Sequence, residues 1–351
     1  MSWSHLIFAI GVKALRTWLV SRRSVSFVTR LVKECKRSSR NGDIQTCPRV
    51  RERKENIVFR ILIFVVVAFP GSATTFAAND GPENAAVDAL IEHLTNEGLA
   101  IAGQQIKLNP VWLKDGISGE EQSKITDKIA GRRMKQFYRD SISATFESDI
   151  ESIKVDGRRA GYAVDFAFIV YASLDDVLKK GAGDKSGIDS LANESEMKVT
   201  ELAPDTTQPK EESAESENTR LVHGQFKLLE KVLISSVVRT SMKRTEESIT
   251  VAWEQDRAFD DAGEISNSWR FTDAPDPNKL AAYNGFAGYA KVTKLKARDG
   301  ALLVEYHYAF AEPKEWSEQK ISLRAKLSIV LQESVRKSRR HIKKMAAADK
   351  Q

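Results

Sequence analysis

Cysteine is nearly absent from this sequence, and both examples lie close to its start. The chain has 351 residues, and its two cysteines are Cys35 and Cys47. The residues that follow therefore have no disulfide, no thiol nucleophile and no thiolate ligand for a metal. In an oxidising compartment they must be held together by burial of apolar surface, for which this part of the chain is long enough.

Short sequence motifs typical of metal sites, phosphate-binding loops and catalytic nucleophiles are also missing. Four of the five histidines lie beyond residue 77, and no two of these are three or four residues apart, which excludes a zinc site built from a helical pair. Gly181–Gly187 lacks the spacing of a phosphate-binding loop, and Glu120 stands where a nucleophile elbow needs glycine. No cofactor is expected, and the sequence favours a protein that is not an enzyme.

Negative charge is scarce only near the N-terminus. The formal net charge is +6, but residues 1–77 hold 14 Lys and Arg against 4 Asp and Glu, out of chain totals of 54 and 48. The remainder is therefore mildly acidic. A basic surface spread over the whole chain would favour nucleic acid as a partner, and the uneven distribution makes nucleic acid an unexpected one.

An apolar run from Ile61 to Phe69 has the features of a secretory signal peptide. Arg60 precedes the run, Pro70 and Gly71 end it, and the residues up to Ala77 supply a cleavage site with small side chains. We predict a signal peptide at 57–77 and an exported protein, either periplasmic or secreted. A membrane anchor retained through residues 57–78 stays open as an alternative.

Residues 1–56 need a separate explanation, because a signal peptide works from the N-terminus. No methionine lies between the first residue and Met134, and Val58 is an attractive non-methionine start. The Arg- and Ser-rich composition, with nothing acidic before Glu34, also fits a transit peptide. We interpret 1–56 as a disordered leader or a mis-assigned start.

The pattern within 78–181 changes from helical to strand-like. Apolar residues at helical spacing predict amphipathic helices at Asn84–Gly98 and Gly119–Asp140. Alternating residues then predict two strands, Thr145–Val155 and Gly161–Ala172, joined by an Asp-Gly turn. The expected fold class is α+β, with antiparallel sheet and N-terminal amphipathic helices, and 78–181 forms its first lobe.

Residues 182–219 contain no aromatic residue and are rich in Glu, Ser, Thr, Lys and Asp. Such a composition buries too little apolar surface to offset chain entropy, so a disordered acidic and polar linker is predicted. Beyond it, 220–333 is predicted to be a mostly β lobe, and 334–351 a basic C-terminal tail. The expected strands are Phe226–Thr240, Ser248–Trp253, a hairpin over Gly285–Phe310, and Ile321–Leu331.

The two lobes share short stretches of similar sequence. Leu90–Leu94 resembles Leu228–Val232, Trp112–Asp115 resembles Trp253–Asp256, and both predicted hairpins turn at Asp-Gly. Because the matches occur in one order at nearly one offset, an internal duplication that gives two similar lobes is a hypothesis worth testing.

Glu305 and His307 are the weak catalytic candidates. They are two residues apart on a predicted strand, so their side chains point to the same face of the sheet. A Glu–His pair can act as a base and its orienting group if that face lines a cleft. A solvated pair on a sheet surface is the commoner arrangement.

Two charged clusters complete the set of candidate sites. Hard cations such as calcium need closely spaced oxygen ligands, and the weak metal candidates are Asp256, Asp260, Asp261 and Glu264. A basic cluster near the C-terminus can contact an anionic surface through charge; it contains Arg336, Lys337, Arg339, Arg340, Lys343 and Lys344.

The sequence favours an exported, non-catalytic binding or structural protein of the cell envelope. Its expected partner is an envelope polymer, an anionic lipid or another envelope protein. Two alternatives stay open: a secreted hydrolase that uses carboxylates and His307, since carboxylate pairs leave no short motif, and a membrane-anchored extracytoplasmic protein. A pocket around His307, Glu305 and a second carboxylate would favour the hydrolase.

Overall fold

Helices and one large antiparallel sheet make up this computed structural model, which confirms the predicted α+β class. The structure describes residues 82–179, 198–202, 219–229, 231–261, 263–276, 278–318 and 323–348. Its helices are α3 (Pro82–Asn96), α4 (Gly119–Ala130), α5 (Met134–Phe137), α6 (Leu174–Lys179), α8 (Lys314–Glu318) and α9 (Leu323–Ala348), with 3-10 turns η1 (Gly131–Arg133) and η2 (Arg257–Phe259).

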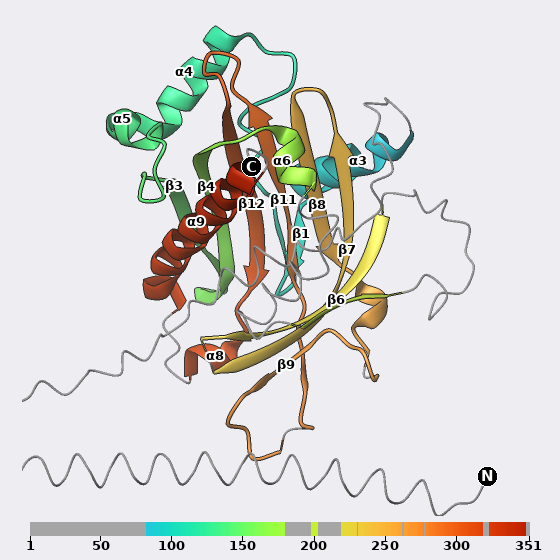
Figure 1. Cartoon of the computed structure of the whole chain (residues 1–351). Helices are drawn as coiled ribbons and strands as arrows, with labels where there is room; N and C mark the ends of the chain where they lie inside the picture. Colours follow the sequence, from blue (N-terminus) through green and yellow to red (C-terminus); the bar gives the residue numbers. More distant parts are fainter. Residues whose placement is uncertain are drawn as a thin grey trace, which may run out of the picture. The chain divides into compact units, whose positions relative to one another are not determined.

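Ten strands form the main sheet in the described part of the chain, and β1 (Leu99–Ile101) and β2 (Gln104–Ile106) pair separately. The ten are β3 (Glu147–Val155), β4 (Arg158–Tyr171), β5 (Lys198–Leu202), β6 (Thr219–Leu228), β7 (Val232–Arg244), β8 (Ser248–Gln255), β9 (Ser268–Phe271), β10 (Ala281–Ala282), β11 (Phe286–Lys294) and β12 (Ala301–Ala311). Their order is β10-β9-β7-β8-β11-β12-β4-β3, and β6 pairs with both β5 and β7 (Figure 1).

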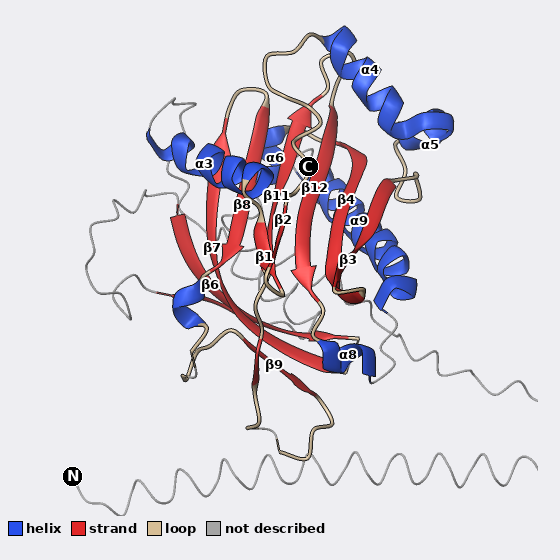
Figure 2. Ribbon diagram, turned by 180° about the vertical axis from the view of Figure 1, so that it is seen from behind, coloured by secondary structure: helices blue, strands red, loops and turns tan. Residues whose placement is uncertain are grey.

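The two faces of the sheet are covered by different elements. We call them the Glu305 face and the Tyr306 face, because successive residues of β12 point to opposite sides. Helix α9 lies across the Tyr306 face, where the guanidinium carbon of Arg339 is 5.5 Å from the Phe168 ring centroid. Helix α3 covers the Glu305 face at β7, β8 and β11, and the two opposite views show α9 and α3 on opposite sides of the sheet (Figures 1 and 2).

Aromatic side chains fill the Tyr306 face. Phe166 on β4 lies directly opposite Tyr306 on β12, and their rings stack with centroids 4.6 Å apart. Leu327, Val330 and Leu331 of α9 are buried in the same cluster. Burial of large apolar side chains from β4, β12 and α9 therefore holds the helix on the sheet.

The predicted hairpin over 145–172 is confirmed, and its turn has a clear cause. Asp156 and Gly157 have φ angles of 50° and 74°, so both central residues are left-handed. This is the conformation of a type I′ turn, whose twist matches that of paired strands and which favours Asp-Gly. The two predicted N-terminal helices also form, and the second ends as α4 at Gly131, where φ is 52°.

The strand expected at Ile321–Leu331 is wrong, because Leu323–Ala348 forms the long helix α9. Its buried residues include Leu323, Leu327, Leu331 and Val335, which recur every four residues and follow one side of a helix. The alternation of apolar and basic residues concealed this spacing. The boundary between a β lobe at 220–333 and a basic tail at 334–351 is wrong for the same reason.

The predicted linker at 182–219 is partly wrong. Lys198–Leu202 forms strand β5, which pairs with β6, and most of the remaining linker lies outside the described residues. Further on, the single strand expected at Phe226–Thr240 is two strands. Leu229 has a φ of 54° and turns the chain between β6 and β7.

The two predicted lobes are not separate in the sheet. Strand β4 from the first lobe pairs along its length with β12 from the second. Two of the three sequence matches behind the duplication hypothesis also fall on unlike structures: Leu90 lies in α3 but Leu228 ends strand β6, and Trp112 lies in a loop but Trp253 in β8. The third, Val164–Phe168 with Val304–Tyr308, falls on two strands, β4 and β12. The duplication hypothesis is therefore not supported.

The predicted leader (1–56) and signal peptide (57–77) lie outside the described residues. Within the part of the chain that the structure describes, no helix combines the length and apolar character needed to span a membrane.

Candidate functional site

Residues 107–118, which we call the crossing segment, pass over the Glu305 face of the sheet. The segment has no regular secondary structure, so its backbone must find partners outside a helix or strand. The backbone N–H groups of Trp112 and Leu113 donate to Glu305 over 2.7 and 3.4 Å, and the Leu113 carbonyl accepts from Lys291 Nζ over 2.8 Å. Side chains of β11 and β12 therefore fix the path of the segment.

Beneath the crossing segment, three ionisable side chains form a chain of hydrogen bonds. His307 Nδ1 is 2.5 Å from Asp165 Oδ1, and His307 Nε2 is 3.2 Å from Glu305 Oε2. The other Asp165 oxygen accepts from the side chain of Asn109 over 2.8 Å. His307 and Glu305 are fully buried, so this Asp165–His307–Glu305 cluster lies inside the protein.

Two carboxylates favour the protonated form of the His307 imidazole. Burial alone would lower the pKa of His307, but the hydrogen bonds to Asp165 and Glu305 outweigh burial and raise this pKa above its ordinary value. In the protonated form both ring nitrogens donate, one to each carboxyl group, which leaves neither with a lone pair to act as a base. His307 is therefore held between two carboxyl groups inside the protein.

Two aromatic rings pack against the imidazole of His307. The ring of Trp112 meets that of His307 edge-on at a centroid distance of 4.7 Å, and Tyr289 lies at 4.9 Å. The Tyr289 hydroxyl donates to the Asn109 carbonyl of the crossing segment. These contacts separate His307 from the surface.

The structure brings together the two residues that strand alternation predicted, since Glu305 and His307 share a face and touch. Sequence reasoning missed Asp165 and Lys291 as members of the same polar region. A signal existed for Asp165, which is the polar exception on an otherwise apolar strand. A catalytic role for Glu305 and His307 stays a prediction, and the sealed geometry favours a structural role.

A groove of about 760 Å³ opens on the other side of Trp112. We call it the Trp112 groove; it lies between the crossing segment, α4 and β3, and is lined by Asn109, Pro110, Val111, Trp112, Ile125, Lys128, Ile129, Glu147, Ser148 and Asp149. Most of its apolar lining side chains are half-buried, whereas Lys128 and Asp149 are exposed. Such a composition suits a ligand with an apolar body and a polar end.

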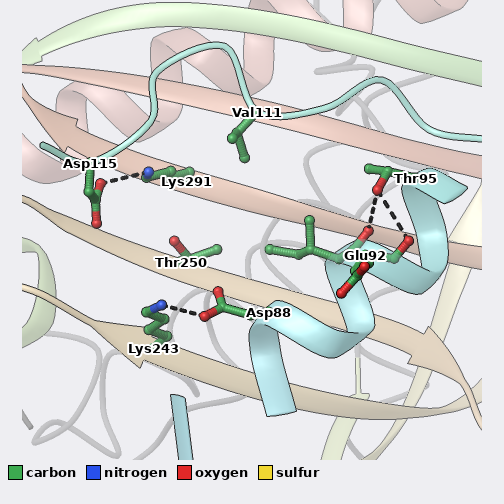
Figure 3. A pocket seen from close by; sticks show the side chains of 9 residues that line it. Asp88, Glu92, Thr95, Val111, Asp115, Lys243, Thr250 and Lys291 are labelled. Carbon is green, nitrogen blue, oxygen red and sulfur yellow. Dashed lines mark hydrogen bonds and ion pairs between the residues drawn. The ribbon is translucent and has the colours of Figure 1, made fainter. Parts of the chain in front are cut away.

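A smaller hollow of about 240 Å³, the lysine pocket, shares Val111 with the groove. It lies under α3 and contains two ion pairs, Lys291 with Asp115 at 2.7 Å and Lys243 with Asp88 at 2.6 Å (Figure 3). Burial raises the pKa of Asp115, but hydrogen bonding and attraction to Lys291 outweigh it and lower this pKa. Each ammonium in the lysine pocket therefore has a carboxylate partner of its own.

The acidic candidates for a metal site have other roles. Asp256 pairs with Arg239 at 3.1 Å and caps the η2 turn, while Asp260 accepts from Asn267 over 2.7 Å. Asp261 and Glu264 are exposed. Among the described residues, no three His, Cys, Asp or Glu side chains gather to hold a metal ion, so the sequence hypothesis of a metal site finds no support.

The basic cluster near the C-terminus lies on α9, and one of its members is misassigned. Arg339 is only 3% exposed, and its guanidinium donates to the carbonyls of Ile169, Ala144 and Thr145. It therefore anchors α9 and is not part of an exposed basic surface. The surface role of Arg336, Lys337, Arg340, Lys343 and Lys344 stays a prediction.

Comparisons with known proteins give only weak similarities. No protein-family model matches the sequence, and no curated protein sequence matches it significantly. The solved structures to which it is similar include the human StarD13 (DLC2) lipid transfer and protein localization domain, with 13% identity, a TM-score of 0.34, and coverage of 65% of this chain and 98% of that one.

Two further structures are similar at the same low level. Human STARD10 has 11% identity and a TM-score of 0.31, with 64% of this chain and 81% of that chain covered. CalU16 from Micromonospora echinospora has 12% identity and a TM-score of 0.21, with 58% and 95% covered. Similarity this weak carries no argument about what the chain binds, so its function must be argued from its own residues.

Proposed function

We propose that this chain is an exported, non-catalytic binding protein of the cell envelope that holds a lipid-like amphiphile in the Trp112 groove. The observation that carries the proposal is the groove itself, whose lining combines half-buried apolar side chains with exposed charged ones. Its volume of about 760 Å³ lies within the range of roughly 300–1,000 Å³ that small-molecule pockets span.

The walls of the groove suit such a ligand. Trp112, Ile125 and Ile129 are half-buried, so each leaves apolar surface that a ligand can cover. Covering that surface removes it from water, which gives about 25 cal/mol for each Å². Lys128 and Asp149 of the lining are both exposed, and an ionic head group can meet either charge there while remaining partly hydrated.

The neighbouring ionisable cluster argues against catalysis. A general base must reach the proton that it removes, whereas His307 is enclosed by Trp112, Tyr289 and two carboxylates. His307 and Glu305 are absent from the lining of the groove. The cluster instead supports the floor on which the crossing segment lies.

Replacing Ile129 by glutamine tests the groove. With cis-parinaric acid, a fluorescent fatty acid, as the probe, we expect saturable binding to the full chain and about tenfold weaker binding to Ile129→Gln, because the variant loses roughly 1.5 kcal/mol of apolar contact. Probe fluorescence during titration measures both affinities.

Ile329→Gln is the matched control, since Ile329 is also a helical isoleucine but is 54% exposed on α9. Its affinity for the probe should equal that of the unsubstituted chain. Equal weakening in the two variants, or binding that never saturates, would count against the groove.

Export rests on the segment Phe59–Asp80 and has its own test. If the chain is exported with cleavage, the protein recovered from its native host should begin at Ala78 or Asn79. N-terminal sequencing and intact mass measure this directly. Recovery of a chain that retains the apolar run from Ile61 would instead favour a membrane anchor.

A further inference from the structure

A third hollow differs from the other two in charge. This arginine pocket of about 120 Å³ lies where α9 meets η1 and the residues before β3; its lining is Arg133, Ser143, Ala144, Thr145, Phe146, Gln332, Val335, Arg336 and Arg339. Three guanidinium groups line it, and the lining contains no carboxylate. The charged groups that line the pocket are therefore all cationic, and two of them, Arg133 and Arg336, also pair with carboxylates just outside the lining.

One side of the pocket is formed by residues that helical spacing places on one side of α9. Gln332, Val335, Arg336 and Arg339 stand at positions i, i+3, i+4 and i+7 of α9, which lie on one side of a helix. The burial of Arg339 fixes this side against the carbonyls of Ala144 and Thr145. The pocket is thus built on a rigid contact between α9 and the segment before β3.

Hydrogen-bond donors in the pocket remain available. A guanidinium has five N–H groups, and the backbone carbonyls that Arg339 contacts accept three hydrogen bonds from it. The Thr145 hydroxyl is buried and has no partner among the described residues. A buried donor without a partner is costly, and an anion in the pocket would satisfy it.

The other two arginines are exposed enough to meet an anion without giving up their ion pairs. Arg336 pairs with Glu333 at 3.0 Å, and Arg133 pairs with Glu147. The side chains of Arg133 and Arg336 are 56% and 37% exposed, respectively, and each bonds its glutamate through one guanidinium nitrogen. A dianion can therefore accept charge-assisted hydrogen bonds from the remaining N–H groups of both.

We propose that the arginine pocket binds a phosphate group, as free inorganic phosphate or as the phosphate of a lipid head group. Its size suits one tetrahedral oxyanion, and forked arginine donors match the geometry of phosphate oxygens. The site is separate from the Trp112 groove, because their linings share no residue. Arg340 is also on α9, but it is exposed and is not part of the pocket lining.

Arg336→Gln and Arg340→Gln form a matched pair for the test. Each removes one positive charge from α9, but only Arg336 lines the pocket. We expect calorimetric titration of the full chain with inorganic phosphate to show about tenfold weaker binding to Arg336→Gln, since a charge-assisted hydrogen bond contributes about 1.5 kcal/mol or more. Arg340→Gln should retain the original affinity.

Vesicle flotation distinguishes the two sources of phosphate. If phosphatidylglycerol vesicles, but not phosphatidylcholine vesicles, carry the chain and Arg336→Gln abolishes this, the ligand is a lipid head group. If inorganic phosphate binds and the vesicles do not, the ligand is a free phosphate. Equal losses in the two variants would show diffuse surface charge and overturn the proposal, as would the absence of phosphate binding in both experiments.

Discussion

Replacing Glu305 by alanine is expected to lower the free energy of unfolding by about 3–5 kcal/mol, the range found when one partner of a buried charged group is removed. The change would leave the His307 Nε2–H and the Trp112 backbone N–H without their acceptor. Both donors are enclosed, so water cannot replace the carboxylate without rearrangement. Urea unfolding of the full chain, followed by circular dichroism, measures the loss.

The control for this variant is Glu151→Ala. Glu151 lies on β3, points to the same face as Glu305, and is exposed. Its loss should change stability by no more than about 0.5 kcal/mol, as for most surface substitutions. If Glu305→Ala lost less than about 1 kcal/mol, the cluster would not be supporting the crossing segment.

Replacing Arg339 by methionine should cost about 3 kcal/mol or more. Methionine keeps the apolar stem but leaves the carbonyls of Ile169, Ala144 and Thr145 without their donor, and each buried group left unsatisfied costs about 1–3 kcal/mol. Burial lowers the pKa of Arg339 to about 10, so the side chain stays charged at neutral pH. Urea unfolding again measures the difference.

Arg340→Met provides the comparison, because Arg340 is the next residue of α9 and is exposed. Only Arg339→Met should also speed hydrogen exchange in the segment before β3, since only Arg339 ties that segment to the helix. Similar stability losses in the two variants would mean that α9 is held by its apolar side alone.

Apolar periodicity and turn residues in the sequence correctly predicted the helices and hairpins that depend on residues close together in the chain. The helix α3, the α4 region and the hairpins β3–β4 and β11–β12 follow from apolar spacing and Asp-Gly turns. The helix α9 was missed, because an alternating stretch of apolar and basic residues at 321–331 also satisfies a strand pattern. A spacing of four, as in Leu323, Leu327 and Leu331, fits both patterns, and the burial of Val330 beside Leu331 is what favours the helix.

Within the Asp165–His307–Glu305 cluster, the sequence predicted only the pair of residues that are close together in the chain. Glu305 and His307 are two residues apart, so strand alternation placed them on one face. Asp165 reaches His307 from 142 residues away, and the segment that covers them comes from 107–118. No periodicity within a strand can report which distant segment covers its face, so the sealing of the cluster could not be foreseen.

The pairing of β4 with β12 constrains how the chain can be made. These neighbouring strands come from early and late parts of the chain, so a nascent polypeptide exposes an unpaired, apolar edge of β4 until β12 has been synthesised. Closing such a long loop costs conformational entropy before the contacts between the two strands can stabilise it. We therefore expect this pairing to form late in synthesis, and a nascent chain stalled before residue 301 to have an open strand edge on which to aggregate.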